Sequence, residues 1–185
     1  MKILITGGAG FIGSNLAKFL LKKSHHLTVV DNLSTGKLSN IESIIDSIDF
    51  YECNLEDFDF NAAKNIDAVF HLAAQASVPV SISDFERSSI SNLASSIRII
   101  DYCSKNKLPF VYASSSALYG DLDIGNDQLS KIDLLSPYAA DKYCMEIYAS
   151  LCSKLYNLRS IGTVSYTHLR AHETPEHRGC RRVGE

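Results

Sequence analysis

The sequence lacks the features that mark several classes of protein. It has no apolar run near the roughly 20 residues that a membrane-spanning helix needs, and strand-forming residues begin at once where a secretory signal would stand. Its five cysteines form no C-x-x-C pair and no spacing typical of a metal site. A net charge of −3 offers no basic face to nucleic acid. We therefore expect a cytoplasmic protein with reduced thiols, no metal, and no contact with membrane or nucleic acid.

Short apolar runs alternate with longer segments of helical periodicity along most of the 185 residues. The runs predict five strands, at Ile3–Ile5, Leu27–Val30, Phe50–Cys53, Ala68–Leu72 and Phe110–Ala113. Arg159–Gly162 is predicted to begin a sixth strand. The longer segments predict helices at Asn15–Leu21, Ser83–Asn106 and Ser136–Asn157. This alternation predicts an α/β fold of one domain, a doubly wound parallel sheet with helices on both faces.

A glycine-rich turn follows the first strand and leads directly into a helix. Gly7, Gly10 and Gly13 recur at G-x-x-G-x-x-G spacing, and Phe11 and Ile12 open the helix. Such a turn is tight and carries no side chain where a pyrophosphate would meet the backbone. The helix N-terminus adds free N–H groups and a partial positive charge. The alternative is an ordinary glycine-rich turn. An ordinary turn need not lie between a strand and a helix, whereas a dinucleotide site must, so we predict a dinucleotide site.

An acidic residue stands where the adenosine ribose of a dinucleotide would lie. Asp31 ends the second strand, 18 residues after Gly13, and a carboxylate there can accept from both ribose hydroxyls. It also repels a 2′-phosphate, which favours NAD over NADP. The turn-rich loop that follows would lie near the adenosine, with Asn32, Ser34 and Gly36 as candidate contacts.

Further candidate residues follow the other strands, at the sheet edge where ligands of doubly wound folds bind. Asn54 and Leu55 follow the third strand, where a small polar side chain could hold the adenine amino group. Small residues at Ala73 and Ala74 would let a cofactor pass close to the backbone. The remaining candidates are the serines Ser114–Ser116 after the fifth strand and the pair Tyr138-x-x-x-Lys142 in the next helix. Each alone has an ordinary explanation, since serines cap helices, alanines pack, and Tyr/Lys pairs occur on solvated faces.

Five longer motifs carry a resemblance to a known family: TGGAGFIG (Thr6–Gly13), VDNLSTG (Val30–Gly36), HLAAQASVPVSI (His71–Ile82), SSSALYGD (Ser114–Asp121) and SPYAADKY (Ser136–Tyr143). Together they resemble the extended short-chain dehydrogenase/reductase family, in particular its nucleotide-sugar epimerases for UDP-glucose and UDP-N-acetylglucosamine. The resemblance covers roughly residues 1–162 and implies a Rossmann fold of the extended type, truncated before the substrate lobe. It also implies NAD as cofactor, a UDP-sugar as substrate, and a homodimer for the full-length relatives.

The resemblance adds residues to the cofactor and substrate sites. It places Leu72 and Ser114 at the cofactor, and Asn92 matches the family's asparagine on the nicotinamide side; the alternative for Asn92 is a solvated polar residue on a helix. Ser77 is a candidate contact to the substrate. His71 is more typical of a packed residue at a strand end than of a catalytic one.

The same resemblance implies a catalytic set. A phenol with a pKa of about 10 is a poor base near neutrality, but Lys142, one helical turn after Tyr138, can stabilise the phenolate. The family's active serine lies four residues before the tyrosine of the Tyr-Gly pair, which selects Ser115, with Ser116 as the second candidate. The implied reaction moves the sugar 4-OH proton to Tyr138 and hydride from C4 to NAD. The 4-keto sugar then takes the hydride back on its other face.

Alternative activities within the family remain open. Its 4,6-dehydratases carry Thr-Asp-Glu where this chain has Ser115-Ser116-Ala117, so the residues for elimination are missing and a 4-epimerase is favoured. Another sugar-nucleotide dehydratase or reductase of the superfamily is the first alternative. A non-catalytic NAD-binding sensor is the second, although such relatives tend to lack the Tyr/Lys pair.

The end of the chain differs in composition from the rest. Val164–Glu185 holds 22 residues with three of the six histidines, four arginines, no lysine and no apolar periodicity. The run VSYTHLRAHET resembles a translated transposase sequencing adapter. We therefore interpret residues 1–162 as an NAD-binding domain that carries the Tyr/Lys pair, and residues 163–185 as a non-native read-through tail. The alternative is a tail that binds a metal or an anion through His168, His172 and His177.

Overall fold

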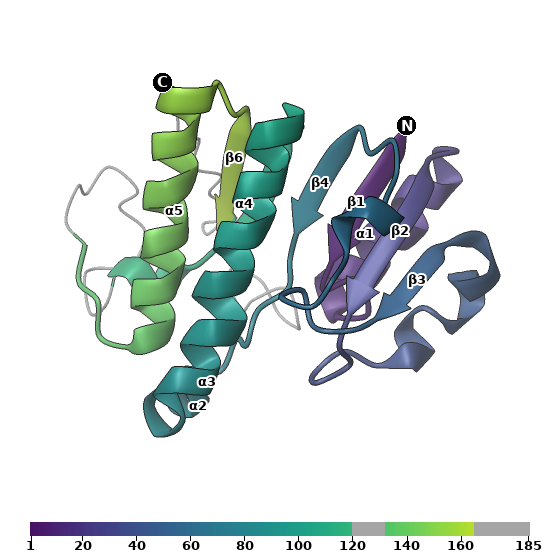
Figure 1. Ribbon diagram of the computed structural model, residues 1–185. Helices are drawn as coiled ribbons and strands as arrows, with labels where there is room; N and C mark the ends of the chain where they lie inside the picture. The colour runs from purple at the N-terminus through teal and green to yellow at the C-terminus, as the bar shows by residue number, and fades with distance from the viewer. Residues whose placement is uncertain (120–131, 165–185) are drawn as a thin grey trace, which may run out of the picture.

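The chain folds around one parallel sheet of six strands, and the computed structural model describes residues 1–119 and 132–164 (Figure 1). Along the chain the strands are β1 (Lys2–Thr6), β2 (His26–Asp31), β3 (Asp49–Glu52), β4 (Ala68–His71), β5 (Phe110–Ser114) and β6 (Ser160–Val164). Across the sheet their order is β3-β2-β1-β4-β5-β6, and neighbouring strands pair in parallel. The chain therefore winds outward in both directions from β1 and β4, and the predicted doubly wound α/β fold is confirmed.

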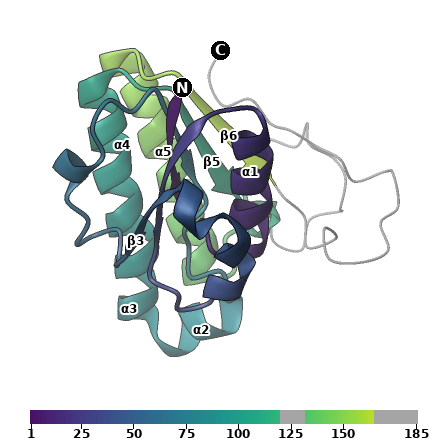
Figure 2. The ribbon, with the colours of Figure 1, turned by 90° about the vertical axis from the view of Figure 1, so that its right-hand side faces the viewer.

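Helices cover both faces of this sheet. Helix α1 (Phe11–Lys22) lies on one face, and helices α4 (Ser95–Asn106) and α5 (Pro137–Tyr156) lie side by side on the other (Figures 1 and 2). Short helical segments complete the connections: α2 (Val78–Ser83), α3 (Phe85–Ser89), the π-helix η4 (Ile90–Ala94), and the 3-10 turns η1 (Leu38–Asn40), η2 (Glu42–Ser47), η3 (Phe60–Ala62) and η5 (Ser116–Tyr119). None of the helices within the described ranges is long and apolar enough to cross a membrane.

The bounds of α5 follow from residues that cap its ends. The Ser136 hydroxyl accepts a hydrogen bond from the Ala139 amide at 3.1 Å, and Pro137 occupies the first turn. At the other end, Asn157 adopts a left-handed conformation with φ of 56°, which closes the helix. The helix predicted over Ser136–Asn157 is thus confirmed to within one residue at each end.

The single helix predicted over Ser83–Asn106 is wrong in its start and in its continuity. Helical structure begins at Val78, because Ser77 accepts from the Val80 amide at 3.4 Å and a proline stands in the first turn. Asp84, with φ of −137° and ψ of 69°, then leaves the helical region and separates α2 from α3. The π-turn of η4 adds a further irregularity that a 3.6-residue period does not reveal.

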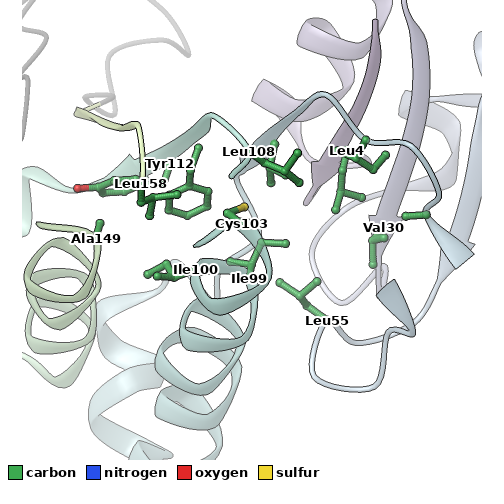
Figure 3. Close-up of a cluster of buried hydrophobic side chains, with 14 of the residues drawn as sticks. Leu4, Val30, Leu55, Ile99, Ile100, Cys103, Leu108, Tyr112, Ala149 and Leu158 are labelled. Carbon is green, nitrogen blue, oxygen red and sulfur yellow. The ribbon is translucent and has the colours of Figure 1, made fainter. Parts of the chain in front are cut away.

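Two hydrophobic cores hold the helices to the sheet. Along β1, Ile3 and Ile5 face α1, whereas Leu4 faces α4, as the alternation of a strand requires. The larger core fills the space between the sheet and α4 and α5 (Figure 3), and includes Val30, Val69, Ile99, Cys103, Phe110, Tyr112, Met145 and Ala149. Each large apolar side chain buried in this way contributes about 1.5–3 kcal/mol relative to exposure. The two cores fix the sheet, and with it the loops at the carboxyl ends of its strands.

The edge strand β6 continues beyond Gly162. Thr163 pairs with Ala113 and Val164 with Ser114, so the strand extends two residues past the domain boundary expected from the sequence. The rest of the expected tail, including its three histidines, lies outside the described residues. The same holds for Gly120 and Asp121 of the SSSALYGD motif.

Candidate dinucleotide and catalytic site

A cleft opens at the carboxyl ends of the central strands. Its volume is about 580 Å³, part of it open to solvent, and its walls come from the loops that follow β1, β2, β3 and β4. Ten of the residues predicted to hold the cofactor line it: Gly7, Gly10, Asp31, Asn32, Ser34, Gly36, Leu55, Leu72, Ala73 and Ala74. The sequence thus places the ligand at the edge of the sheet where the structure has its cleft.

Two glycines of the turn are required by packing within the protein, and a third keeps space free in the cleft. Gly7 has φ of +71°, and a Cβ there would lie 2.5 Å from the Ala73 amide nitrogen. A Cβ on Gly13 would lie 2.2 Å from the Gly7 carbonyl oxygen, so both positions need glycine for packing alone. Gly10 differs, because its Cβ would meet only the Gly7 oxygen at 3.3 Å and would otherwise point into open space. Gly10 lines the cleft, so the space that it keeps free fits the pyrophosphate of a dinucleotide.

The N-terminus of α1 offers free donors next to this turn. The first intrahelical hydrogen bond runs from Ser14 N to Gly10 O at 3.0 Å, which leaves the amides of Phe11, Ile12 and Gly13 before it. No side chain caps the helix, and no acidic residue occupies its first turn. Phe11 and Ile12, the first two residues of the helix, are exposed at 51% and 38%. Free amides and the positive end of the helix dipole together suit a diphosphate.

The Asp31 carboxylate organises the rim of the cleft. Its Oδ2 accepts from the Ala9 amide at 2.8 Å and its Oδ1 from the Leu33 amide at 2.9 Å. A Cβ on Gly36 would lie 2.9 Å from Oδ1, so the loop passes directly over the carboxylate. Each oxygen keeps a second lone pair, which can accept from one ribose hydroxyl.

The amide side chain of Asn54 is engaged within the protein. Its oxygen accepts from Asn32 Nδ2 at 2.9 Å, and its nitrogen donates to Asp57 Oδ2 at 3.0 Å. The bond to Asn32 ties the loop after β2 to the loop after β3, and the bond to Asp57 closes a turn within the second loop. Leu55, and not Asn54, is the residue of this pair that lines the cleft.

Asn92 lies in the π-helix η4 and clamps the loop that follows β4. It is 4% exposed, its Oδ1 accepts from the Gln75 amide at 2.8 Å, and its Nδ2 donates to the Gln75 carbonyl at 3.1 Å. The predicted alternative of a solvated residue is therefore wrong. Both polar groups of the Asn92 side chain bind the loop backbone, and Asn92 is not among the residues that line the cleft.

Tyr138, Lys142 and Ser115 come together beside the end of β5. Ser81 accepts from the Tyr138 amide at 3.2 Å and so fixes the first turn of α5. Tyr138 and Lys142 are one turn apart on the buried side of that helix, 9% and 3% exposed. The Lys142 ammonium donates to the Ala113 carbonyl at 2.9 Å, and Ser115 forms a hydrogen bond with the Tyr138 side chain.

Burial sets the protonation states of this group. Burial raises the pKa of the Tyr138 phenol, and the hydrogen bond from Ser115 partly opposes that rise. Burial lowers the pKa of the Lys142 ammonium to about 8, against the neighbouring Asp141 carboxylate, which raises it. Burial also raises the pKa of Asp141, which accepts from Ser89 at 3.1 Å. Tyr138 therefore keeps its proton at neutral pH, while Lys142 carries positive charge.

The other predicted serines have contacts within the protein. Ser114 is 6% exposed and donates to the Glu146 carboxylate at 2.5 Å, which joins the end of β5 to α5. Ser116 begins the short turn η5, and Ser77 caps α2. Ser115 is thus the serine that the structure brings to Tyr138.

Sequence reasoning missed several residues that line the cleft: Val30, Thr35, Cys53, Glu56, Ser91 and Ser95. Thr35 lies within the loop singled out after β2 and could have been included. Ser91 and Ser95 reach the cleft from η4 and α4, which only the packing of these helices against the sheet reveals. Within the described ranges, no group of three His, Cys, Asp or Glu side chains could hold a metal ion.

A doubly wound sheet with a glycine turn, an acidic residue at the end of β2 and a buried Tyr/Lys pair defines a dinucleotide-binding domain of the short-chain dehydrogenase/reductase type. A comparison with known families agrees, because the profile of the NAD dependent epimerase/dehydratase family matches residues 3–183. The chain belongs to this family, whose cofactor is NAD, and the glycine turn, Asp31 and the free amides of α1 fit that cofactor.

Known proteins that resemble the chain include both curated sequences and solved structures. Protein CapI of Staphylococcus aureus is 38% identical over 181 residues, which cover 90% of this chain and 54% of that protein. The UDP-N-acetylglucosamine 4-epimerase of Methanobrevibacter ruminantium superimposes with a TM-score of 0.83 at 32% identity, over 88% of this chain and 54% of that one. The UDP-glucose 4-epimerase of Thermus thermophilus in complex with NAD gives 0.79 at 33% identity, over 89% and 54%. The chain thus spans about half the length of the curated relatives that it matches.

Proposed function

We propose that this chain is the cofactor-binding part of an enzyme that epimerises a UDP-sugar at C4 with NAD. The observation that carries the proposal is the meeting of Ser115, Tyr138 and Lys142 beside the end of β5, at the same edge of the sheet as the nucleotide cleft. Solved relatives with similar folds are named as 4-epimerases of UDP-glucose and UDP-N-acetylglucosamine, which supports this reaction.

The chain's own residues have distinct roles in this proposal. When bound, NAD accepts a hydride from the sugar carbon and returns it. In its phenolate form, Tyr138 takes the proton of the sugar hydroxyl and later gives it back, and Ser115 orients that hydroxyl by a hydrogen bond. Because burial raises the pKa of Tyr138, its phenolate needs positive charge nearby, which the Lys142 ammonium supplies from one turn along α5.

The residues next to Ser115 favour an epimerase over a dehydratase. Elimination of water needs an additional acid and base, whereas Ser116 and Ala117 stand at the positions where dehydratases of the resembled family carry acidic residues. We propose Ser77, on the loop that leads into α2, as a contact to the substrate. An enzyme that moves a hydride between C4 and NAD and a proton between the 4-hydroxyl and Tyr138 needs no further acid or base for elimination.

A homodimer is part of the same proposal. Helices α4 and α5 carry apolar side chains on their outer surfaces, with Ile97, Ile147, Leu151 and Leu155 exposed at 39%, 47%, 44% and 61%. A second copy that packed on these two helices would cover them. Sedimentation of wild type and of Leu151→Glu tests this part, with a dimer expected only for wild type.

The decisive experiment measures epimerisation by the complete protein encoded by the gene. We expect interconversion of UDP-glucose and UDP-galactose, or of their N-acetyl forms, without net consumption of NADH. Tyr138→Phe should abolish turnover and keep NAD binding, while Tyr143→Phe, on the same helix, should keep both. Net NADH consumption would favour a reductase. A Tyr138→Phe protein that still performs its cellular role would favour a sensor.

We also propose that residues 163–185 are a read-through tail. The proposal is supported by the change in composition after Gly162 and by the adapter-like run. Two observations run against the proposal, because the family match extends to residue 183 and β6 includes Thr163 and Val164. The origin of these residues is therefore tested on the gene itself. Sequencing of the source gene past the Gly162 codon should reveal a different continuation. The same 23 codons in the native transcript would contradict the proposal.

A further inference from the structure

A chain of buried polar groups lies directly behind the cofactor cleft and joins four elements of the fold. Thr6 of β1, His71 of β4, Ser96 of α4 and Asn92 of η4 are between 0% and 4% exposed. Thr6 Oγ1 and His71 Nδ1 are 2.7 Å apart, and His71 Nε2 and Ser96 Oγ are 3.1 Å apart. The Ser96 hydroxyl in turn donates to the Asn92 carbonyl at 2.5 Å.

The partners of this chain fix the tautomer of His71. A hydroxyl has one proton, and Ser96 donates its proton to the Asn92 carbonyl. Ser96 must therefore accept from His71, which places the ring proton on Nε2. Nδ1 is then an acceptor, so Thr6 donates to it, and the Thr6 oxygen is left to accept from the Ala73 amide at 3.3 Å. Every hydrogen bond in the series is then donated in the same direction, from the Ala73 amide towards the Asn92 carbonyl.

Both ends of this series of hydrogen-bonded groups hold the loop that follows β4. Thr6 binds the loop at Ala73, and Asn92 binds it at Gln75 through two hydrogen bonds of 2.8 and 3.1 Å. Ala73 and Ala74 line the cleft, and the loop backbone packs so closely on Gly7 that a Cβ there would lie 2.5 Å from the Ala73 nitrogen. A small shift of Ala73 would therefore change the space between the loop and the glycine turn.

We propose that His71 is a positioning residue for the dinucleotide, whose neutral ring, protonated on Nε2, joins Thr6 to Ser96 and thereby holds the loop 72–75 at the distance that the cofactor needs. The ring touches neither the cleft nor the reacting atoms. It acts through Ala73 on one side and through the Asn92 carbonyl on the other. Burial, and the charge of Lys142, lower the pKa of His71 to about 3, so the ring stays neutral near physiological pH. The proposal rests on the proposed function only in taking NAD as the dinucleotide.

The first test uses the unmodified 185-residue chain. Nuclear magnetic resonance of isotope-labelled histidine separates the two neutral tautomers and the cation by their nitrogen shifts. We expect one histidine with its proton on Nε2 between about pH 5 and about pH 8, where an ordinary histidine titrates. If the His71 ring titrated in this range, or carried its proton on Nδ1, the proposal would be overturned.

The second test breaks the chain of hydrogen bonds in two places. Ser96→Ala removes the acceptor for Nε2 but keeps the ring, and His71→Leu removes the ring. In both variants we expect faster hydrogen exchange at the amides of Ala73 and Gln75, and NAD affinity about tenfold lower by calorimetry. His71→Asn should restore part of the affinity lost in His71→Leu, because its oxygen can accept from Thr6. His26→Gln, an exposed histidine of β2, is the control and should change neither quantity.

The outcomes distinguish the role of His71 from the identity of the ligand. Unchanged exchange at Ala73 in Ser96→Ala, or equal NAD affinity in His71→Leu and wild type, would show that His71 only fills space at the end of the strand. If wild type bound no NAD, the identity of the ligand would be wrong. The tautomer and the exchange rates would then still decide whether His71 positions the loop.

Discussion

The Lys142 ammonium lies one helical turn after Tyr138 and donates to the carbonyl oxygen of Ala113, 2.9 Å away at the end of β5. This contact places a buried positive charge between the last residues of β5 and the first turns of α5. Burial lowers the pKa of Lys142 to about 8, although the Asp141 carboxylate beside it acts in the opposite direction. Burial of this charge therefore lowers the free energy of unfolding, and the charge lies where it can stabilise a Tyr138 phenolate.

The lowered pKa of Lys142 predicts a gain in stability at alkaline pH. Its pKa is about 8 in the folded chain, against 10.5 for a lysine side chain free in water, so between these values the unfolded chain holds a proton that the folded chain has released. Stability then rises with pH, by up to about 1.4 kcal/mol per pH unit. Urea unfolding of wild type and Lys142→Met should show a difference that grows in favour of wild type across this window. Lys154→Met, an exposed lysine on the same helix, should show no such trend, and a flat difference for Lys142→Met would contradict the prediction.

Asp31 predicts how the chain distinguishes NAD from NADP. Its carboxylate is held by the amides of Ala9 and Leu33 and would face the 2′ position of the ribose. We expect wild type to prefer NAD, and Asp31→Asn to reduce the ratio of the two affinities about tenfold, since the repulsion of a 2′-phosphate is lost. Calorimetry with both dinucleotides gives this ratio, which a general loss of stability does not change. Asp46→Asn, at an exposed position, is the matched control, and an unchanged ratio in Asp31→Asn would remove Asp31 from the ribose site.

Local patterns account for the parts of the site that the sequence predicted. The glycine turn, Asp31 and the caps of α5 depend on residues close together in the chain, so their spacing alone places them. The contacts of Asn92 and Ser91 depend on the π-helix η4 and on its packing against the sheet, which no period in the sequence reveals. For Asn54, its position after β3 places the amide near the expected adenine, but the sequence does not reveal its hydrogen-bond partners. Its partner Asn32 comes from how two loops meet, whereas its partner Asp57 lies three residues further along the same loop.

The bond between Ser114 and Glu146 predicts a stability effect away from the cleft. Glu146 is 5% exposed, and the Ser114 hydroxyl donates to its carboxylate at 2.5 Å. Glu146→Leu should lower the free energy of unfolding by about 1–3 kcal/mol, because a buried hydroxyl loses its acceptor. Glu146→Gln keeps an acceptor oxygen and should lose less.

A double-mutant cycle isolates this bond from the packing around it. Ser114→Ala made in the Glu146→Leu background should cost less than the same change in wild type, since no bond is left to break. Urea unfolding of the four proteins gives the coupling. Glu86→Gln, at an exposed position of α3, should leave stability unchanged. Equal costs of Ser114→Ala in both backgrounds would show that the contact contributes nothing.

Gly10 and Gly13 predict opposite effects of the same substitution. A Cβ on Gly13 would lie 2.2 Å from the Gly7 carbonyl oxygen, so Gly13→Ala forces the backbone to move and should cost more than about 2 kcal/mol in unfolding free energy. A Cβ on Gly10 would meet only the Gly7 oxygen at 3.3 Å and would project into the cleft. As the residue before the first turn of α1, Gly10→Ala should cost about 1 kcal/mol or less. It should nevertheless weaken NAD binding at least about tenfold, because the methyl group occupies the approach of the pyrophosphate.

The comparison of these two variants separates glycines needed by the fold from one needed by the ligand. Thermal unfolding and NAD calorimetry are measured on the same preparations, so loss of fold and loss of affinity can be told apart. If Gly10→Ala bound NAD as tightly as wild type, the pyrophosphate would not pass over Gly10. The free amides of Phe11, Ile12 and Gly13 would then have to hold it from the other side of the turn. If Gly13→Ala were as stable as wild type, the turn would have room that its geometry does not show, and the tight fit of Gly7 against Ala73 would need the same test.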